Sequence, residues 1–119
     1  MPTGAEEKGK RRESHMDHSE MKRRVCEAID GRRDEIIGLG RAIRDTPELG
    51  FKEHKTAATV ARTFAAHGIP YQEKLAITGV KGILTGAAAG PTIGILGELD
   101  SLVCPDSPYL DKATGAAHT

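Results

Sequence analysis

The sequence predicts an α/β protein in which two N-terminal helices pack on a partial mixed sheet. Three observations support this prediction. Apolar residues recur at helical spacing up to His67, shorter strand-like segments follow Gly68, and a mostly apolar run extends from Thr92 to Leu99. Helical periodicity that gives way to strand periodicity within one short chain is typical of an α/β arrangement.

The chain has 119 residues, which is enough for one small domain. Its first 18 residues carry many charges and almost no large apolar side chain. Such a segment cannot offset the entropy lost on ordering. We therefore expect a disordered charged arm over residues 1–18 and a folded part over residues 19–119.

One long helix is expected after the arm. It should begin near Asp17–Glu20, because Asp17 or Ser19 can accept a free backbone N–H and Glu20 suits the positive end of the helix dipole. It should end at Asp45-Thr46-Pro47, since the residue before a proline is pushed out of the helical region. The spacing predicts about six or seven turns, with a bend or close contact at one of its three glycines. Its expected apolar face consists of Val25, Ile29, Ile36, Leu39 and Ile43.

A second helix is expected from about Lys52 to His67. Gly68 is well placed as its left-handed C-terminal cap. Its apolar stripe would be formed by Ala57, Val60, Ala61 and Phe64.

Three strands should follow the second helix. Two short strands are predicted over Ile69–Glu73 and Val80–Thr85, and Gly86–Gly90 reads as a flexible turn. The run Thr92–Leu99 has the pattern of a strand that is covered on both faces.

The last predicted strand leads to two carboxylates, Glu98 and Asp100, at its carboxyl end. Open α/β sheets bind their ligands at this end. Residues two apart on a strand point to the same face, so the two acids would repel each other unless a cation lay between them. This pattern is compatible with a metal site, directly or through orientation of a ligating histidine, although acids at the end of a strand are more often solvated or capping groups.

Composition argues against several classes of partner. Lys plus Arg and Asp plus Glu are balanced at 17 each, and only 3% of residues are aromatic, which disfavours nucleic-acid binding. The basic run Lys8–Arg12 is flanked by Glu6, Glu7 and Glu13 and reads as a solvated tail. No stretch reaches the roughly 18 apolar residues of a membrane helix, and no secretory signal is visible, so we expect a cytoplasmic protein without membrane contact. Cys26 and Cys104 lack metal-type spacing and read as ordinary reduced thiols.

A family resemblance rests on the stretch Gly38 to Ile69 and on two later motifs. The stretch carries Pro47-Glu48-Leu49-Gly50-Phe51, then Glu53 and Lys55-Thr56-Ala57. Thr78-Gly79-Val80, the turn Gly90-Pro91 and the strand GILGELDSL continue the pattern. Together they resemble the amidohydrolase branch of the zinc-dependent aminoacylase and carboxypeptidase G superfamily, which includes indole-acetyl-amino-acid hydrolases and aminobenzoyl-glutamate hydrolases. The resemblance covers the chain from Ile29 onward.

This resemblance implies hydrolysis of the amide bond of N-acyl amino acids or dipeptides, with water activated between two divalent ions, zinc first among them. It gives Asp100, and less directly Glu98, a place near the metals. His118 matches the position just ahead of a Cys-Gly-His ligand motif and is not itself a ligand there. His54 and His67 are expected at the surface, and His15 and His18 in the arm.

Residues 115–119, Gly-Ala-Ala-His-Thr, match the approach to that ligand motif. We therefore expect the chain to be an N-terminal fragment whose metal ligands lie beyond Thr119. In isolation it should bind no metal, lack activity and tend to self-associate, because its apolar strand would keep an unpaired edge. The alternative is a non-catalytic α/β module that associates with a full-length relative.

Overall fold

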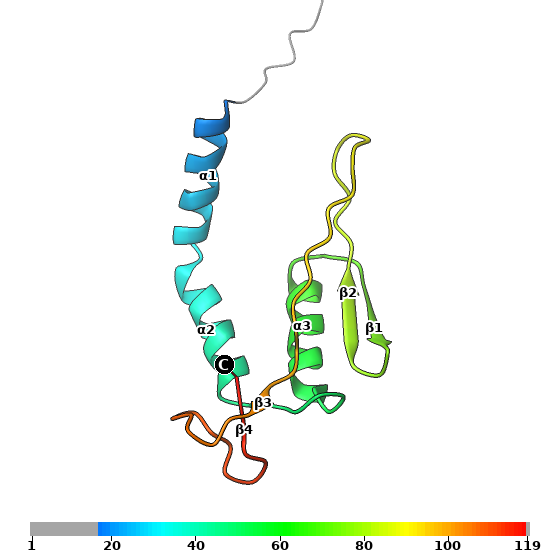
Figure 1. The fold of residues 1–119 in the computed structure, drawn as a ribbon. Coiled ribbons are helices and arrows are strands. Elements are labelled where there is room, and N and C mark those ends of the chain that lie inside the picture. The colour runs from blue at the N-terminus through cyan, green and yellow to red at the C-terminus, as the bar shows by residue number, and fades with distance from the viewer. Residues whose placement is uncertain (1–16, 119) are drawn as a thin grey trace, which may run out of the picture. The chain divides into compact units, whose positions relative to one another are not determined.

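The computed structural model describes residues 17–118 (Figure 1). They fall into two units, one ending at Asp34 and one beginning at Glu35, and each is described by itself. The predicted arm lies outside the described residues, apart from Asp17 and His18. No helix in the described part of the chain combines the length and the apolar character needed to cross a membrane.

The first unit contains the helix α1 (His18–Asp30), which begins where the capping pattern predicted. Arg23 pairs with Glu20 and Glu27 one turn away on either side. The helix ends at Gly31, whose N–H donates to the Glu27 carbonyl. None of its apolar side chains is buried.

The prediction of one long helix is wrong, because a second helix, α2 (Arg33–Arg44), begins after a turn at Gly31-Arg32. Glycine weakens a helix interior, and the turn falls at the first of the three predicted weak points. The end of α2 agrees with the prediction: the Thr46 hydroxyl donates to the Ala42 carbonyl just before Pro47.

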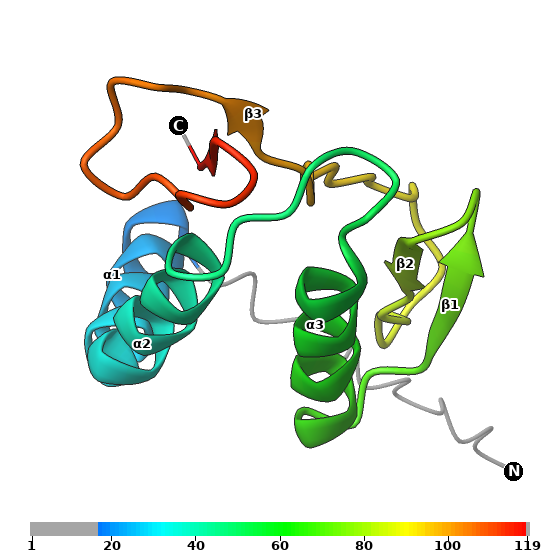
Figure 2. The same cartoon turned by 90° about the horizontal axis from the view of Figure 1, so that it is seen from below.

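In the second unit, the helix α3 (His54–Ala66) packs against a hairpin of β1 (Tyr71–Leu75) and β2 (Gly79–Gly82) (Figure 2). The strands are antiparallel, with Tyr71 opposite Gly82. Gly82 allows the close approach, since a Cβ there would lie 2.9 Å from a ring carbon of Phe64. Gly68 has a φ of +66°, as expected of a left-handed cap.

The predicted strand Thr92–Leu99 is wrong: residues 83–100 form neither helix nor strand. Ile95 and Leu96 are each 97% exposed. A strand needs a partner for its backbone groups, and the described residues supply none here. Ser101 forms one parallel bridge with Leu49, and β3 (Leu102–Val103) pairs antiparallel with β4 (Ala116–Ala117).

The architecture is therefore mixed α/β, with two separate two-stranded antiparallel sheets in the described part of the chain. The expectation of two N-terminal helices on a partial mixed sheet is wrong in that form. Only α3 covers a hairpin, and the single parallel contact among the described residues is the bridge between Leu49 and Ser101.

Candidate functional site

The two predicted site acids lie just before the buried Ser101. Glu98 and Asp100 precede β3 in a segment without strand partners, and both are exposed. Asp100 lies beside the Gly50 main chain, because a Cβ at Gly50 would be 4.0 Å from Asp100 Oδ2. The structure therefore brings Asp100 next to the loop between α2 and α3, and it records no such neighbour for Glu98.

The α2–α3 loop is fixed by the carboxylate of Glu48. Its oxygens accept hydrogen bonds from Lys55 N at 3.0 Å, Thr56 N at 2.8 Å and Thr56 Oγ1 at 2.9 Å. These amides belong to the first turn of α3, where a negative charge is favoured by the helix dipole. Glu48 thus caps α3 from the preceding loop.

Partial burial by itself raises the pKa of the Glu48 carboxyl. The hydrogen bonds from Lys55 and Thr56, together with the Lys55 charge, act in the opposite direction and prevail. The net pKa of Glu48 lies below its ordinary value, so the carboxylate is ionised at neutral pH.

The main-chain carbonyl of Glu48 binds Ser101, at the end of the segment that carries Asp100. The Glu48 carbonyl accepts the Ser101 N–H at 2.8 Å and the Ser101 hydroxyl at 2.7 Å. Ser101 is only 3% exposed, and its bridge to Leu49 extends the same contact. Glu48 therefore contacts α3 through its side chain. Through its main-chain carbonyl it contacts Ser101, the residue after Asp100.

A second glutamate ties α3 to the hairpin. Glu53, 7% exposed, stands at the N-terminus of α3, and its Oε2 accepts the Thr78 hydroxyl at 2.8 Å. Burial raises the pKa of Glu53, but the hydrogen bonds, that from Thr78 among them, outweigh this effect and leave the pKa below its usual range.

Two neighbouring residues of the hairpin loop, Ala76 and Ile77, have positive φ angles, which are unusual for residues with a Cβ.

Asp111 organises the loop that leads to His118. Its Oδ1 accepts the N–H groups of Ala113 and Thr114 and the Thr114 hydroxyl, at 2.9 to 3.0 Å. These bonds from Thr114, with that from Ala113, lower the pKa of Asp111. The loop closes where the Asp111 N–H donates to the Ala116 carbonyl at 2.9 Å.

His118 follows β4 directly. The register pairs Leu102 with Ala117, and continuing it by one residue sets His118 opposite Ser101. Among the described residues, Nε2 of His118 is a buried side-chain atom without a hydrogen-bond partner.

The described residues do not form a complete metal site. None of their His, Cys, Asp and Glu side chains gather in groups of three or more that could hold an ion. A catalytic zinc needs about three protein ligands, and the unpartnered nitrogen of His118 supplies at most one. Cys26 and Cys104 are free thiols, as predicted. His54 is exposed as predicted, and so is His67, whose Nε2 lies 3.1 Å from Glu35 Oε1.

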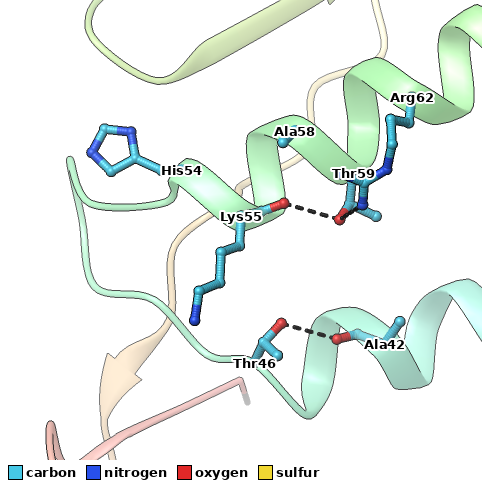
Figure 3. Close-up of a pocket in the computed structure, with 7 residues that line it drawn as sticks. All are labelled: Ala42, Thr46, His54, Lys55, Ala58, Thr59 and Arg62. Carbon is cyan, nitrogen blue, oxygen red and sulfur yellow. Dashed lines mark hydrogen bonds between the residues drawn. The ribbon is translucent and has the colours of Figure 1, made fainter.

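A hollow of about 490 Å³ lies between the end of α2 and the first turns of α3 (Figure 3). Several of its polar groups are paired with one another. Thr46 donates to the Ala42 carbonyl, Thr59 donates to the Lys55 carbonyl, and Arg62 donates to the Thr59 hydroxyl. Neither Asp100 nor His118 lines this hollow.

Sequence reasoning gave no structural role to Glu48, Ser101 or Asp111. Glu48 carried one usable signal, because it precedes a predicted helix start and an acid there can cap the first turn. The contact between Glu48 and Ser101 joins residues 53 positions apart. Nothing in the local pattern indicates it.

Over 87% of its length the chain is 30% identical to YhaA of Bacillus subtilis (strain 168), which is named as an amidohydrolase and of which it covers 27%. It is 32% identical over 71% of its length to thermostable carboxypeptidase 1 of Saccharolobus solfataricus, covering 23% of that protein. It is 34% identical over 64% of its length to hippurate hydrolase of Campylobacter jejuni, covering 21% of it.

The chain thus spans about a quarter of the length of these curated relatives. No family profile matches it, and no solved structure does. These relatives are named as an amidohydrolase, a carboxypeptidase and a hippurate hydrolase, in agreement with the motifs that begin at Pro47. Over the part of their length that it spans, the chain is homologous to these hydrolases, in agreement with its resemblance to the amidohydrolase branch of the aminoacylase and carboxypeptidase G superfamily.

Proposed function

We propose that the chain is the N-terminal portion of a metal-dependent amidohydrolase that cleaves the amide bond of N-acyl amino acids or dipeptides. The similarity to amidohydrolases over 87% of the chain carries this proposal. The anchoring of Asp100 supports it, since Ser101 fixes the main chain next to an acid that is itself open to solvent. The Asp100 carboxylate can therefore contact a side chain or ion that other parts of the complete enzyme supply.

The complete enzyme is proposed to hold two divalent ions, zinc first among them, on ligands outside the described residues. Asp100, and less directly Glu98, would lie near these ions and orient a ligating side chain. Residues 19–119 would then be an incomplete catalytic domain that binds no metal and has no activity by itself. The substrate is proposed to be a small molecule, and the compartment the cytoplasm.

The first test reads the coding DNA past the codon for Thr119. A Cys-Gly-His triplet directly downstream, in any frame, is expected if the chain is the front of such an enzyme. An unrelated sequence that continues in frame to a proper terminator would contradict the proposal.

The second test assays the protein encoded by the complete reading frame on hippurate and on N-acetyl amino acids. We expect zinc-dependent release of the amino acid, abolished by a chelator. Asp100→Asn should lower kcat strongly, whereas the matched control Asp106→Asn, at an exposed loop acid, should not. A metal-loaded protein that is folded but inactive on all these amides would refute the assignment.

The non-catalytic module is the second candidate. It is favoured by the exposed apolar side chains of Ile93, Ile95 and Leu96 and by the lack of a metal-binding group among the described residues. Purification of the 119-residue chain as a stable monomer, with no ligand motif encoded downstream, would support it. Stoichiometric zinc with turnover in this short chain would exclude it and would also overturn the claim that the site is incomplete.

A further inference from the structure

Glu48 contacts two parts of the second unit with two different groups. Its carboxylate accepts three hydrogen bonds from Lys55 and Thr56 in the first turn of α3. Its carbonyl accepts both the N–H and the hydroxyl of Ser101. The first set of bonds fixes where the Glu48 residue lies, and the second fixes the segment that ends in Asp100.

The neighbours of Glu48 extend the same contact. Leu49 bridges to Ser101, and Gly50 follows it with Asp100 Oδ2 next to its main chain. Thr56 and Ser101, the two residues that Glu48 joins, are each only 3% exposed. The bonds that Thr56 and Ser101 donate to Glu48 are part-buried, so losing one would leave a partly buried polar group without its partner.

We propose that Glu48 is a positioning residue for Asp100: by joining Ser101 to the first turn of α3, it sets where the Asp100 carboxylate lies. The simpler alternative is that Glu48 only caps α3. The two accounts differ in what happens at Asp100 when α3 remains folded. The catalytic meaning of this positioning rests on the proposed function, but the positioning itself does not.

The test uses NMR on the 119-residue chain with the variants Glu48→Gln and Glu48→Ala. The matched control is Glu53→Gln, the same change at a glutamate that binds Thr78 and the Phe51 backbone but makes no bond to Ser101. Three quantities are measured: exchange of the Ser101 amide proton, the nuclear Overhauser effect between Gly50 Hα and Asp100 Hβ, and the Cα shifts of α3.

We expect Glu48→Gln to speed Ser101 amide exchange by about fivefold to tenfold, as the loss of about one net hydrogen bond would. It should also weaken the Gly50–Asp100 effect while the α3 shifts remain helical. Glu48→Ala should act in the same direction and more strongly, because glutamine keeps one acceptor oxygen. Glu53→Gln should leave Ser101 amide exchange unchanged.

Equal changes at Ser101 in the Glu48→Gln and Glu53→Gln variants would overturn the proposal, because both would then report only on α3. Unchanged exchange and an unchanged Gly50–Asp100 effect in Glu48→Gln would overturn it as well.

If the Glu48 variants do not fold, Ser101→Ala decides, since it removes one bond to the Glu48 carbonyl without touching α3. A weakened Gly50–Asp100 effect with helical α3 shifts supports the proposal, and an unchanged effect refutes it. None of these readouts needs metal or turnover, so a failed amidohydrolase assay would not change what they show about Glu48.

Discussion

Thr78 and Glu53 are 25 residues apart in the chain, yet their side chains form a buried hydrogen bond. Thr78→Val keeps the shape of the side chain and removes the hydroxyl donor to Glu53 Oε2. The loss of a donor to a buried carboxylate is expected to lower the free energy of unfolding by about 1–3 kcal/mol. Urea denaturation followed by circular dichroism measures this change.

Thr85→Val is the control for that change, because Thr85 is exposed and lies outside the hairpin strands. Its effect should stay within about 0.5 kcal/mol, as for ordinary surface substitutions. Equal effects of the two variants would show that the bond between Thr78 and Glu53 does not stabilise the fold.

The carboxyls of Glu48, Glu53 and Asp111 share one pH dependence, because each has its pKa lowered in the folded chain. A lowered folded pKa contributes stability above the unfolded pKa, about 4.3 for Glu and 3.9 for Asp. That contribution is lost as the pH falls through the folded pKa. We therefore expect the unfolding midpoint in urea to be constant near neutral pH and to fall below about pH 4.

Glu48→Gln should remove part of that acid dependence, since an amide at this position does not titrate. The comparison is the slope of unfolding free energy against pH for the variant and the unaltered chain. A stability that increases on acidification would contradict the assignment of lowered pKa values.

At the scale of elements, the same Gly→Ala change at two positions, Gly82 and Gly38, should have opposite effects on stability. A Cβ at Gly82 would lie 2.9 Å from Phe64 and 3.1 Å from Ile69, so Gly82→Ala should push β2 away from α3 and destabilise the fold by about 1–3 kcal/mol. A Cβ at Gly38, inside α2, meets nothing within 4 Å. Gly38→Ala should therefore stabilise α2 by up to about 1 kcal/mol.

Thermal unfolding of the two variants measures both effects, and far-ultraviolet circular dichroism checks the helix content of Gly38→Ala. A melting temperature lowered by Gly38→Ala would mean that α2 contacts another part of the chain at this position. A Gly82→Ala variant as stable as the unaltered chain would mean that Phe64 does not pack on β2.

The helices were predictable because their signals are local. The Pro47 stop, the Gly68 cap and the start near Asp17 are all found where their backbone preferences place them. The split at Gly31 was predictable only as a weak point, since three glycines offered the same signal. The two short strands were also predicted, with boundaries displaced by one to three residues, but their pairing with each other was not.

The strand Thr92–Leu99 could not be settled from its own residues. An apolar run forms a strand only when neighbouring strands accept its hydrogen bonds, and those neighbours need not be close in sequence. The same reason hid the contact between Glu48 and Ser101. At the site, Asp100 was singled out as an acid after the predicted strand and by the family resemblance, and its neighbours came from the structure.

At the scale of the whole molecule, the segment from Ile93 to Leu96 predicts how the chain behaves in solution. Ile93 is 83% exposed, and Ile95 and Leu96 are 97% exposed. An extended apolar segment with unpaired backbone groups is a template for pairing with a second chain. We expect the 119-residue protein to associate in a concentration-dependent way, measured by sedimentation velocity.

Ile95→Lys should weaken this association, because it removes an apolar side chain and adds a charge to the segment. Thr92→Lys is the control, since it adds the same charge nearby and keeps Ile93, Ile95 and Leu96. Association weakened more by Ile95→Lys than by Thr92→Lys identifies apolar contact as its cause. If both variants act equally, charge repulsion alone controls assembly, and a monomer at every concentration would mean that this segment does not pair between chains.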